Sequence, residues 1–190
     1  MSKVSLKPGP FVVPMPVALV GAMVNGVPNF MPAAFMGIMN FDPPIVGAGL
    51  SPTHHTCEGI VENGTFSLNL PGPEMVAAAD WCGLHSGKNT DKSGVFETFT
   101  EELDTAPMIR QCRLTMECRL VQTVEFKVDT VYFGEIVGVY ADGDALADGA
   151  PDWKKINPLI FTFPDKGYWT LGDWVAEAWS AGKEYDGPGS

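Results

Sequence analysis

Glycine and proline recur along the whole of this chain, and their spacing limits the length of any regular element. The sequence contains 21 glycines and 16 prolines in 190 residues, spread along it rather than gathered in one segment. Both residue types interrupt helices and strands. The stretches of sequence between them are therefore typical of short strands joined by turns. We therefore expect about seven strands in mostly sequential order, with short helices inserted, which favours an antiparallel β-barrel over a doubly wound sheet.

The composition indicates a folded chain and disfavours two classes of partner. Hydrophobic residues make up 45% and charged residues only 18%, which argues against disorder. The longest apolar stretches are broken before they reach membrane-spanning length. Twelve basic and 23 acidic residues leave a net charge of −11, which repels phosphate backbones and anionic lipids. We therefore expect neither nucleic acid nor a membrane as a partner.

The amino-terminal residues and the cysteines bear on the compartment. No continuous apolar segment with a small-residue cleavage site follows the first lysines, so we expect no secretory signal. The four cysteines, in a chain of this size, fit reduced thiols better than a disulfide framework. These observations predict a cytoplasmic protein, and the length predicts one domain over residues 1–190.

Alternating or continuous apolar runs bounded by turn residues mark the expected strands. Asn25-Gly26 is a hairpin-type turn after the first of them. The segment 66–70 alternates apolar and polar residues, so we expect it to be half-buried. The expected strands are 16–24, 45–50, 66–70, 112–126 and 131–140, with a hairpin over 159–171.

Three further segments have helical or mixed character. The run 29–41 is apolar almost throughout, and Pro32 and Gly37 predict an edge strand or an extended cavity-lining segment. Residues 51–64 have Ser and Thr cap candidates and an Asn-Gly stop, which predicts a short helix. Pro and Gly bound a second helix over 73–83, and the spacing of apolar residues predicts a third over 173–182. Residues 85–94 form a polar loop.

The motifs that carry function form an ordered set rather than one signature. No Gly-x-Gly-x-x-Gly follows an expected strand, and no Gly-Lys-Ser/Thr phosphate loop occurs, so a dinucleotide fingerprint is not expected. The segments that occur in order are Pro28-Asn-Phe-Met-Pro-Ala-Ala-Phe35, Pro43-Pro44, Leu50-Ser-Pro-Thr-His-His-Thr56, Asn63-Gly-Thr-Phe-Ser-Leu-Asn-Leu-Pro71, Asp80-Trp-Cys-Gly, Ser86-Gly-Lys, Asp91-Lys92, Ala106-Pro-Met-Ile, Gly134-Glu-Ile-Val, Asn157-Pro-Leu and Tyr168-Trp-Thr-Leu-Gly172.

This ordered set resembles the flavin reductase-like FMN-binding split-barrel family, and within it the flavoredoxin group. The resemblance covers about residues 10 to 183, which leaves 184–190 as an expected flexible tail. It implies a mainly β fold with short helices, an antiparallel FMN-binding split β-barrel. It also implies FMN as the cofactor and a homodimer with the flavin near the subunit boundary.

The resemblance assigns eight residues to FMN and no side chain to catalysis. An isoalloxazine ring needs an apolar slot and backbone donors near the atoms that gain electron density on reduction. The phosphate needs hydroxyls, free amides at a helix start and, in an acidic protein, a local cation. The ring stretch contains Asn29, Met31, Ala33 and Phe35; the phosphate side contains Leu50, Ser51 and Thr56 at the strand-to-helix corner, and Lys92 on the polar loop.

One departure from the family pattern limits this assignment. Many relatives have a histidine a few residues before the Gly-Glu of the penultimate strand, whereas this chain reads Asp129-Thr-Val-Tyr-Phe-Gly134. A role for that histidine is therefore not carried over.

Each assigned residue also has an ordinary structural explanation, and a metal site is a further alternative. Asn29 suits a turn, Phe35 a core, Ser51 and Thr56 helix caps, and Lys92 a solvated loop. The side chains that suggest zinc are His54, His55, Cys57, Cys82 and His85. Structural zinc takes four ligands in paired spacings, and no Cys-x-x-Cys pair occurs, so we expect no metal. We likewise expect no catalytic cysteine.

Two classes of function therefore stay open. The first is an FMN-dependent oxidoreductase or electron carrier, with a redox protein or NAD(P)H as its partner. Within that class, an NAD(P)H:flavin oxidoreductase that supplies reduced flavin is the alternative. The second is a non-enzymatic barrel that binds an apolar ligand. The acidic surface is suited to attract a basic redox protein.

Overall fold

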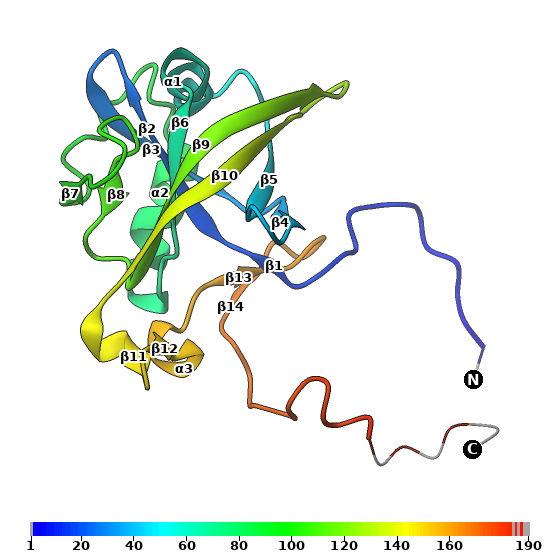
Figure 1. Ribbon diagram of the computed structural model, residues 1–190. Helices are drawn as coiled ribbons and strands as arrows, with labels where there is room; N and C mark the ends of the chain where they lie inside the picture. The colour runs from blue at the N-terminus through cyan, green and yellow to red at the C-terminus, as the bar shows by residue number, and fades with distance from the viewer. Residues whose placement is uncertain (1, 184, 186, 188–190) are drawn as a thin grey trace.

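A computed structural model describes residues 2–183, 185 and 187 (Figure 1). Within them, the main sheet has seven strands in the order β3–β2–β6–β9–β10–β5–β4, and every paired neighbour is antiparallel. This arrangement agrees with the antiparallel fold expected from the spacing of turns. The strands of this sheet are β2 Ala18–Val24, β3 Val27–Ala33, β4 Met36–Asn40, β5 Ile45–Leu50, β6 Thr65–Asn69, β9 Leu114–Glu125 and β10 Thr130–Ala141.

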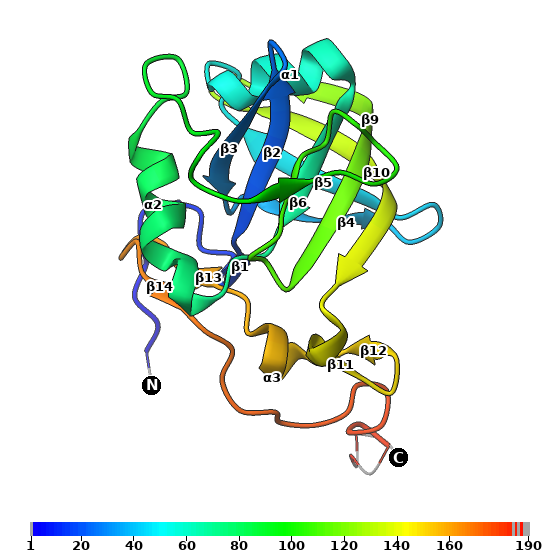
Figure 2. The same cartoon turned by 90° about the vertical axis from the view of Figure 1, so that its left-hand side faces the viewer.

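The two edges of this sheet are joined by a short stretch of chain. β3 ends at Ala33 on one edge, and β4 begins at Met36 on the other. Met31 and Ala33 of β3 pack in one core cluster with Ala48 and Leu50 of β5, the strand that pairs with the other edge strand, β4. The sheet therefore curls around a shared interior, as Figure 2 shows. The edge position and the cavity lining expected for 29–41 are confirmed. The run is not one strand, however, because it contributes to both edge strands of a closing barrel.

Smaller sheets flank the barrel. The hairpin expected over 159–171 is confirmed, although its paired strands are short. The first small sheet joins β1 Met15–Pro16, β13 Ile160–Phe161 and β14 Tyr168–Trp169; the others pair β7 Thr98–Phe99 with β8 Met108–Ile109, and β11 Leu146–Ala147 with β12 Ala150–Pro151.

The helices are short, as the glycine and proline spacing predicts. The helix expected over 51–64 ends at Gly64, whose φ of 66° places it in the left-handed region that favours glycine. Its N-cap is His54, which makes no side-chain capping bond, so the predicted Ser and Thr caps are wrong. The helices are α1 His55–Asn63, α2 Val76–Leu84 and α3 Trp153–Ile156, with 3-10 turns η1 Pro73–Met75 and η2 Gly143–Ala145.

The helix expected over 173–182 is wrong. Residues 171–177 have no regular structure, and residues 178–183 form turns. Trp174 and Trp179, which were to form its apolar face, are exposed. An isolated helix of this length is marginal in water unless its apolar face packs against the fold. The tail expected over 184–190 lies outside the described residues, apart from 185 and 187.

The core lies inside the barrel and against α1. Phe66 and Leu68 of β6 lie in it, together with Ile60 of α1. All five residues of β6 are buried, so its predicted half-burial is wrong. The reason is that the outer face is covered: Ser67 Oγ donates to the Pro107 carbonyl, and the Ile109 N–H donates to Asn69 Oδ1. In the part of the chain that is described, no helix has the length and apolar character needed to cross a bilayer.

Candidate functional site

Two adjoining pockets lie beside β3, and together their walls include all eight residues assigned from the sequence. We call them the polar pocket, of about 260 Å³, and the apolar pocket, of about 220 Å³. They share Met31, Pro32 and His54, so they form one continuous cleft, within the usual size range for small-molecule sites of roughly 300–1,000 Å³. Asn29, Thr56 and Lys92 line the polar pocket; Ala33, Phe35, Leu50 and Ser51 line the apolar pocket; Met31 lines both.

Strand periodicity explains why β3 contributes to both pockets. Asn29, Met31 and Ala33 are two residues apart, and alternate residues of a strand point to the same face. All three are buried, with Asn29 at the polar end of the cleft and Ala33 at the apolar end. One strand therefore provides a polar contact, a flexible apolar side chain and a small side chain in sequence along the cleft.

Asn29 is bonded to the start of α1. Its Nδ2 donates to Thr56 Oγ1 over 2.7 Å, and both side chains are buried. The Thr56 hydroxyl accepts this bond, so its own proton stays free for another acceptor. Thr56 lies in the first turn of α1, where backbone N–H groups lack acceptors within the helix. The corner therefore gathers donors at the polar pocket.

Lys92 is the most unusual residue of the polar pocket. It is 3% exposed, and its Nζ donates to the carbonyls of Phe30 and Cys82 over 3.0 and 2.7 Å. A lysine ammonium has three N–H donors, so one remains for a ligand. Among the described residues, no carboxylate lies within ion-pair distance of it. A buried ammonium without a counter-charge is unfavourable, so its presence beside a pocket suits an anionic ligand.

Burial also controls the protonation of the groups around Lys92. Burial lowers the pKa of Lys92 itself. Burial and, next, the charge of Lys92 lower the pKa of His54, which keeps that imidazole neutral at pH 7. Burial raises the pKa of the Cys82 thiol, although Lys92 acts in the opposite direction. The ammonium of Lys92 is therefore the positive charge that the polar pocket offers an anion.

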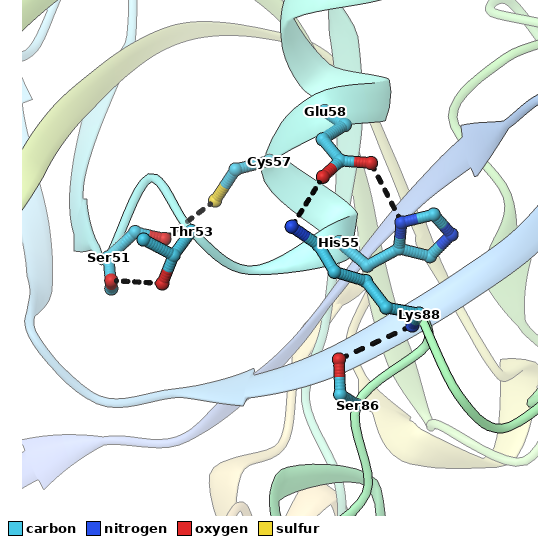
Figure 3. A network of polar contacts seen from close by, with 7 residues as sticks. All are labelled: Ser51, Thr53, His55, Cys57, Glu58, Ser86 and Lys88. Atoms are coloured by element: carbon cyan, nitrogen blue, oxygen red, sulfur yellow. Dashed lines mark hydrogen bonds and ion pairs between the residues drawn. The ribbon is translucent and has the colours of Figure 1, made fainter.

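The loop that carries Lys92 is held against α1 by an ion-pair network (Figure 3). Lys88 Nζ lies 2.8 Å from Glu58 Oε1, and His55 Nδ1 lies 2.9 Å from Glu58 Oε2. Hydrogen bonds from Lys88 and His55 lower the pKa of the Glu58 carboxyl. The network joins the first turn of α1 to the loop, whose Ser86 and Gly87 line the polar pocket together with His55.

The structure separates Ser51 from the other residues assigned to the phosphate. Its Oγ lies 3.0 Å from Thr53 Oγ1, on the apolar pocket, whereas Thr56 and Lys92 line the polar pocket. Figure 3 shows this hydroxyl pair on the side of the corner away from Glu58. Leu50 is buried beside Ser51, and Phe35 is 44% exposed at the mouth of the apolar pocket. The cleft thus has a cationic end and an apolar end.

Sequence reasoning missed Gly87 and His54 as parts of the site. A Cβ at Gly87 would lie 2.2 Å from Asn29 Oδ1 and 2.7 Å from His55 Cδ2, so only glycine lets the loop approach the pocket this closely. The glycine within Ser86-Gly-Lys88 was the available signal. His54 had been weighed only as a zinc ligand. Among the described residues, no three His, Cys, Asp or Glu side chains are grouped so that they could hold a metal ion.

Comparison with known proteins gives a consistent result. Residues 11–168 match the model of the flavin reductase like domain. A flavoredoxin from Methanosarcina acetivorans is 46% identical, with a TM-score of 0.93 over 96% of this chain and 98% of that one. Flavoredoxin of Desulfovibrio vulgaris (Miyazaki F) is 33% identical, with a TM-score of 0.89 over 96% of this chain and all of that one. An uncharacterized Archaeoglobus fulgidus protein is 33% identical over 68% of this chain and 75% of its own length.

Proposed function

The chain belongs to the flavin reductase-like family, a flavin-binding family with a split-barrel fold, and from that premise we propose that it is an FMN-binding electron-transfer protein. Two solved structures of similar proteins are those of flavoredoxins. The proposal covers three points: the flavin is FMN, it binds in the cleft beside β3, and a redox protein exchanges electrons with it.

The buried, unpaired ammonium of Lys92 is the observation that supports FMN in this cleft. A flavin with a terminal phosphate brings an anion that fits the polar pocket, where Lys92 has a free donor and Thr56 a free hydroxyl proton. The apolar pocket next to it offers Met31, Ala33 and Leu50 to a planar ring. The cleft therefore matches both chemical parts of FMN.

The protein's own residues act by binding and exclusion. Bound FMN supplies hydride and electron transfer at its ring. Lys92 and Thr56 hold the phosphate, Asn29 fixes the Thr56 hydroxyl, and the apolar pocket keeps water from one side of the ring. Within this proposal no side chain acts as a general acid or base.

The charge distribution favours a protein partner over a nicotinamide cofactor. A net charge of −11 attracts a basic protein and repels an anionic dinucleotide at long range. Lys88 and Lys92 do not change this long-range expectation, because the net charge of −11 already includes them. We therefore place a basic redox protein ahead of NAD(P)H as the partner.

An absorption spectrum and a rate series test the proposal. The purified protein should show the absorption bands of bound flavin. If these bands are absent after incubation with FMN and removal of the unbound flavin, the remaining hypothesis is a non-enzymatic barrel that binds an apolar ligand. Stopped-flow reduction by a small basic redox protein should be faster than by NADH or NADPH, and it should slow as salt screens the attraction. Rapid, saturable and nearly salt-independent reduction by NADH or NADPH alone would instead identify a flavin reductase.

We also propose a cytoplasmic homodimer. Four buried cysteines without a disulfide fit a reducing compartment. Large apolar side chains stay exposed around the cleft, on β4 and on the β9–β10 turn, and a second copy would cover them. These exposed side chains are Phe35, Ile38, Met39, Phe41, Phe126 and Val128.

A further inference from the structure

The segment after β14 carries apolar side chains that its own chain leaves uncovered. We call residues 171–183 the C-terminal arm. Trp174, Val175 and Trp179 are 75%, 89% and 96% exposed. Figure 1 shows the arm, in orange and red, running away from the barrel. Tryptophan is strongly favoured in the buried centres of protein interfaces, so two fully solvated tryptophans in one segment call for a partner surface.

The arm is held at its start by a lysine of α3. Lys154 Nζ donates to the Gly172 carbonyl and lies 3.9 Å from the Asp173 carboxylate. Within the described part of the chain, hydrogen bonds and ion pairs connect the arm to the rest of the fold only at Lys154. Figures 1 and 2 both place the arm below the barrel, beside α3. The arm begins just after β14, whose Tyr168 lies close to Ala33 and Ala34, and then runs below the barrel, so the groove of its own chain stays uncovered.

A large apolar groove lies open beside the proposed flavin cleft. It has a volume of about 720 Å³. Phe126 and Val128, on the β9–β10 turn, are 66% and 71% exposed at its rim. The groove shares Ala34, Phe35, Gly49 and Asp129 with the apolar pocket, so whatever fills the groove also closes the cleft from outside.

We propose that the C-terminal arm of one copy lies in the apolar groove of a second copy and completes its flavin site. This inference rests on the proposed function, because the site that it completes is the flavin cleft. The arm supplies solvated tryptophans, and the groove supplies methionine, phenylalanine, valine and proline walls. In a two-fold dimer each arm meets the other chain's groove, so both copies are covered at once.

The area that the two arms would bury agrees with this occupant. Four tryptophans, two from each arm, bury about 150–250 Å² each, and the grooves that receive them bury a comparable area. The total falls in the range of roughly 1,200–2,000 Å² that stable interfaces bury. Glu177 of the arm is acidic, and Lys127 on the groove is exposed and makes no ion pair among the described residues. Asp129 also lines the groove, so the two surfaces match in their apolar character and in one pair of opposite charges, Glu177 and Lys127.

The first test compares two exposed tryptophan sites by analytical ultracentrifugation of the full chain. The double variant Trp174→Ser/Trp179→Ser should raise the dimer dissociation constant by on the order of tenfold or more. The control Trp153→Ser, at a half-exposed tryptophan of α3 outside the arm, should leave that constant unchanged. Equal dimerisation of the double variant and the wild type, or a monomeric wild type, would overturn the proposal.

The second test asks whether the arm crosses between chains. Val128→Asp places a charge in the groove and should weaken the dimer as the arm variant does. In an equal mixture of the two variants, the mixed dimer keeps one intact arm and one intact groove, so dimer should reappear. A mixture that behaves as the sum of its components would show that the arm acts within its own chain and would overturn the proposal.

Flavin binding is measured separately in the same samples. At saturating FMN, the arm variants should still bind one flavin per chain, but release it several times faster than the wild type. Release at the wild-type rate from the weakened dimers would refute completion of the site by the arm. If no sample bound FMN but the arm and groove variants still weakened the dimer as expected, the proposed function would be wrong. The exchange of arms between the two chains would still stand.

Discussion

Asn29 Nδ2 donates to Thr56 Oγ1 across 2.7 Å, linking the edge strand β3 to the first turn of α1 inside the barrel wall. The two residues lie 27 positions apart in the sequence. The bond sets the direction of the Thr56 hydroxyl proton, which then points to whatever anion occupies the polar pocket. Under the proposed function, Asn29 acts as a positioning residue for the FMN phosphate.

Removing the Asn29 amide should weaken FMN more than riboflavin. Asn29→Ala frees the Thr56 hydroxyl to rotate, and the loss should be about 1–3 kcal/mol in FMN binding, the range for a buried hydrogen bond whose partner is left unsatisfied. Thr56→Val should produce a similar loss, and the double variant should lose less than the sum. Isothermal titration with both flavins measures this, and additive losses would show that the two side chains act independently.

Lys92 should discriminate FMN from riboflavin. Lys92→Met removes the buried ammonium while keeping much of its volume, and it should weaken FMN by about 1–3 kcal/mol, the range for a hydrogen bond to a charged group. Riboflavin affinity should stay nearly constant, since riboflavin has no phosphate. The matched control is Lys88→Met, at a lysine that is paired with Glu58 on the surface. Equal losses for the two flavins would place the phosphate elsewhere.

FMN affinity should depend on pH through Lys92. Burial lowers the pKa of Lys92 in the free protein below its ordinary value of 10.5, and a bound phosphate dianion favours the charged form. Binding therefore takes up a proton, so affinity is greatest below the free-protein pKa and falls as pH rises through it. Titrations from pH 7 to 10 should show this fall for FMN and a smaller one for riboflavin. In Lys92→Met the two flavins should have parallel pH profiles.

The buried thiols should make the protein less stable in alkali. Burial raises the pKa of Cys57 to about 11, and it raises the pKa values of Cys112 and Cys118 further. Unfolding returns these thiols to an ordinary pKa near 9. Because the pKa of these thiols is higher in the folded than in the unfolded chain, their contribution to the free energy of unfolding is fully present below about pH 9 and is lost as pH rises. The urea midpoint should fall between pH 8 and 10, and Cys112→Ala should flatten that fall. If the urea midpoint of Cys112→Ala fell with pH as steeply as that of the wild type, the pKa of Cys112 would be the same in the folded and the unfolded chain.

Local signals in the sequence predicted the turns and most strands. Asn25-Gly26 has φ values of 51° and 77°, as a tight hairpin turn requires, and Gly64 ends α1 in the left-handed region. These features depend on a few adjacent residues, so they can be read without the rest of the chain.

Features that depend on distant packing were not predicted. The opposite positions of β3 and β4 follow from barrel closure, and the burial of β6 follows from the loop that carries Pro107. Burial of Lys92 depends on Phe30 and Cys82, which lie 62 and 10 residues away. The apolar spacing at Trp174 and Trp179 suggested a helix, but that pattern forms one only against a packing surface, which its own chain does not offer.

Under the proposed function, one FMN binds each chain with its phosphate on the Lys92 side of the cleft. The direct measurement is calorimetric titration of flavin-free protein with FMN and with riboflavin at pH 7, in the wild type and in Lys92→Met. We expect one FMN per chain, with riboflavin on the order of tenfold or more weaker in the wild type, and a smaller difference between the two flavins in Lys92→Met, where Thr56 still contacts the phosphate. Equal affinities for the two flavins in the wild type, or no binding of FMN, would contradict the account.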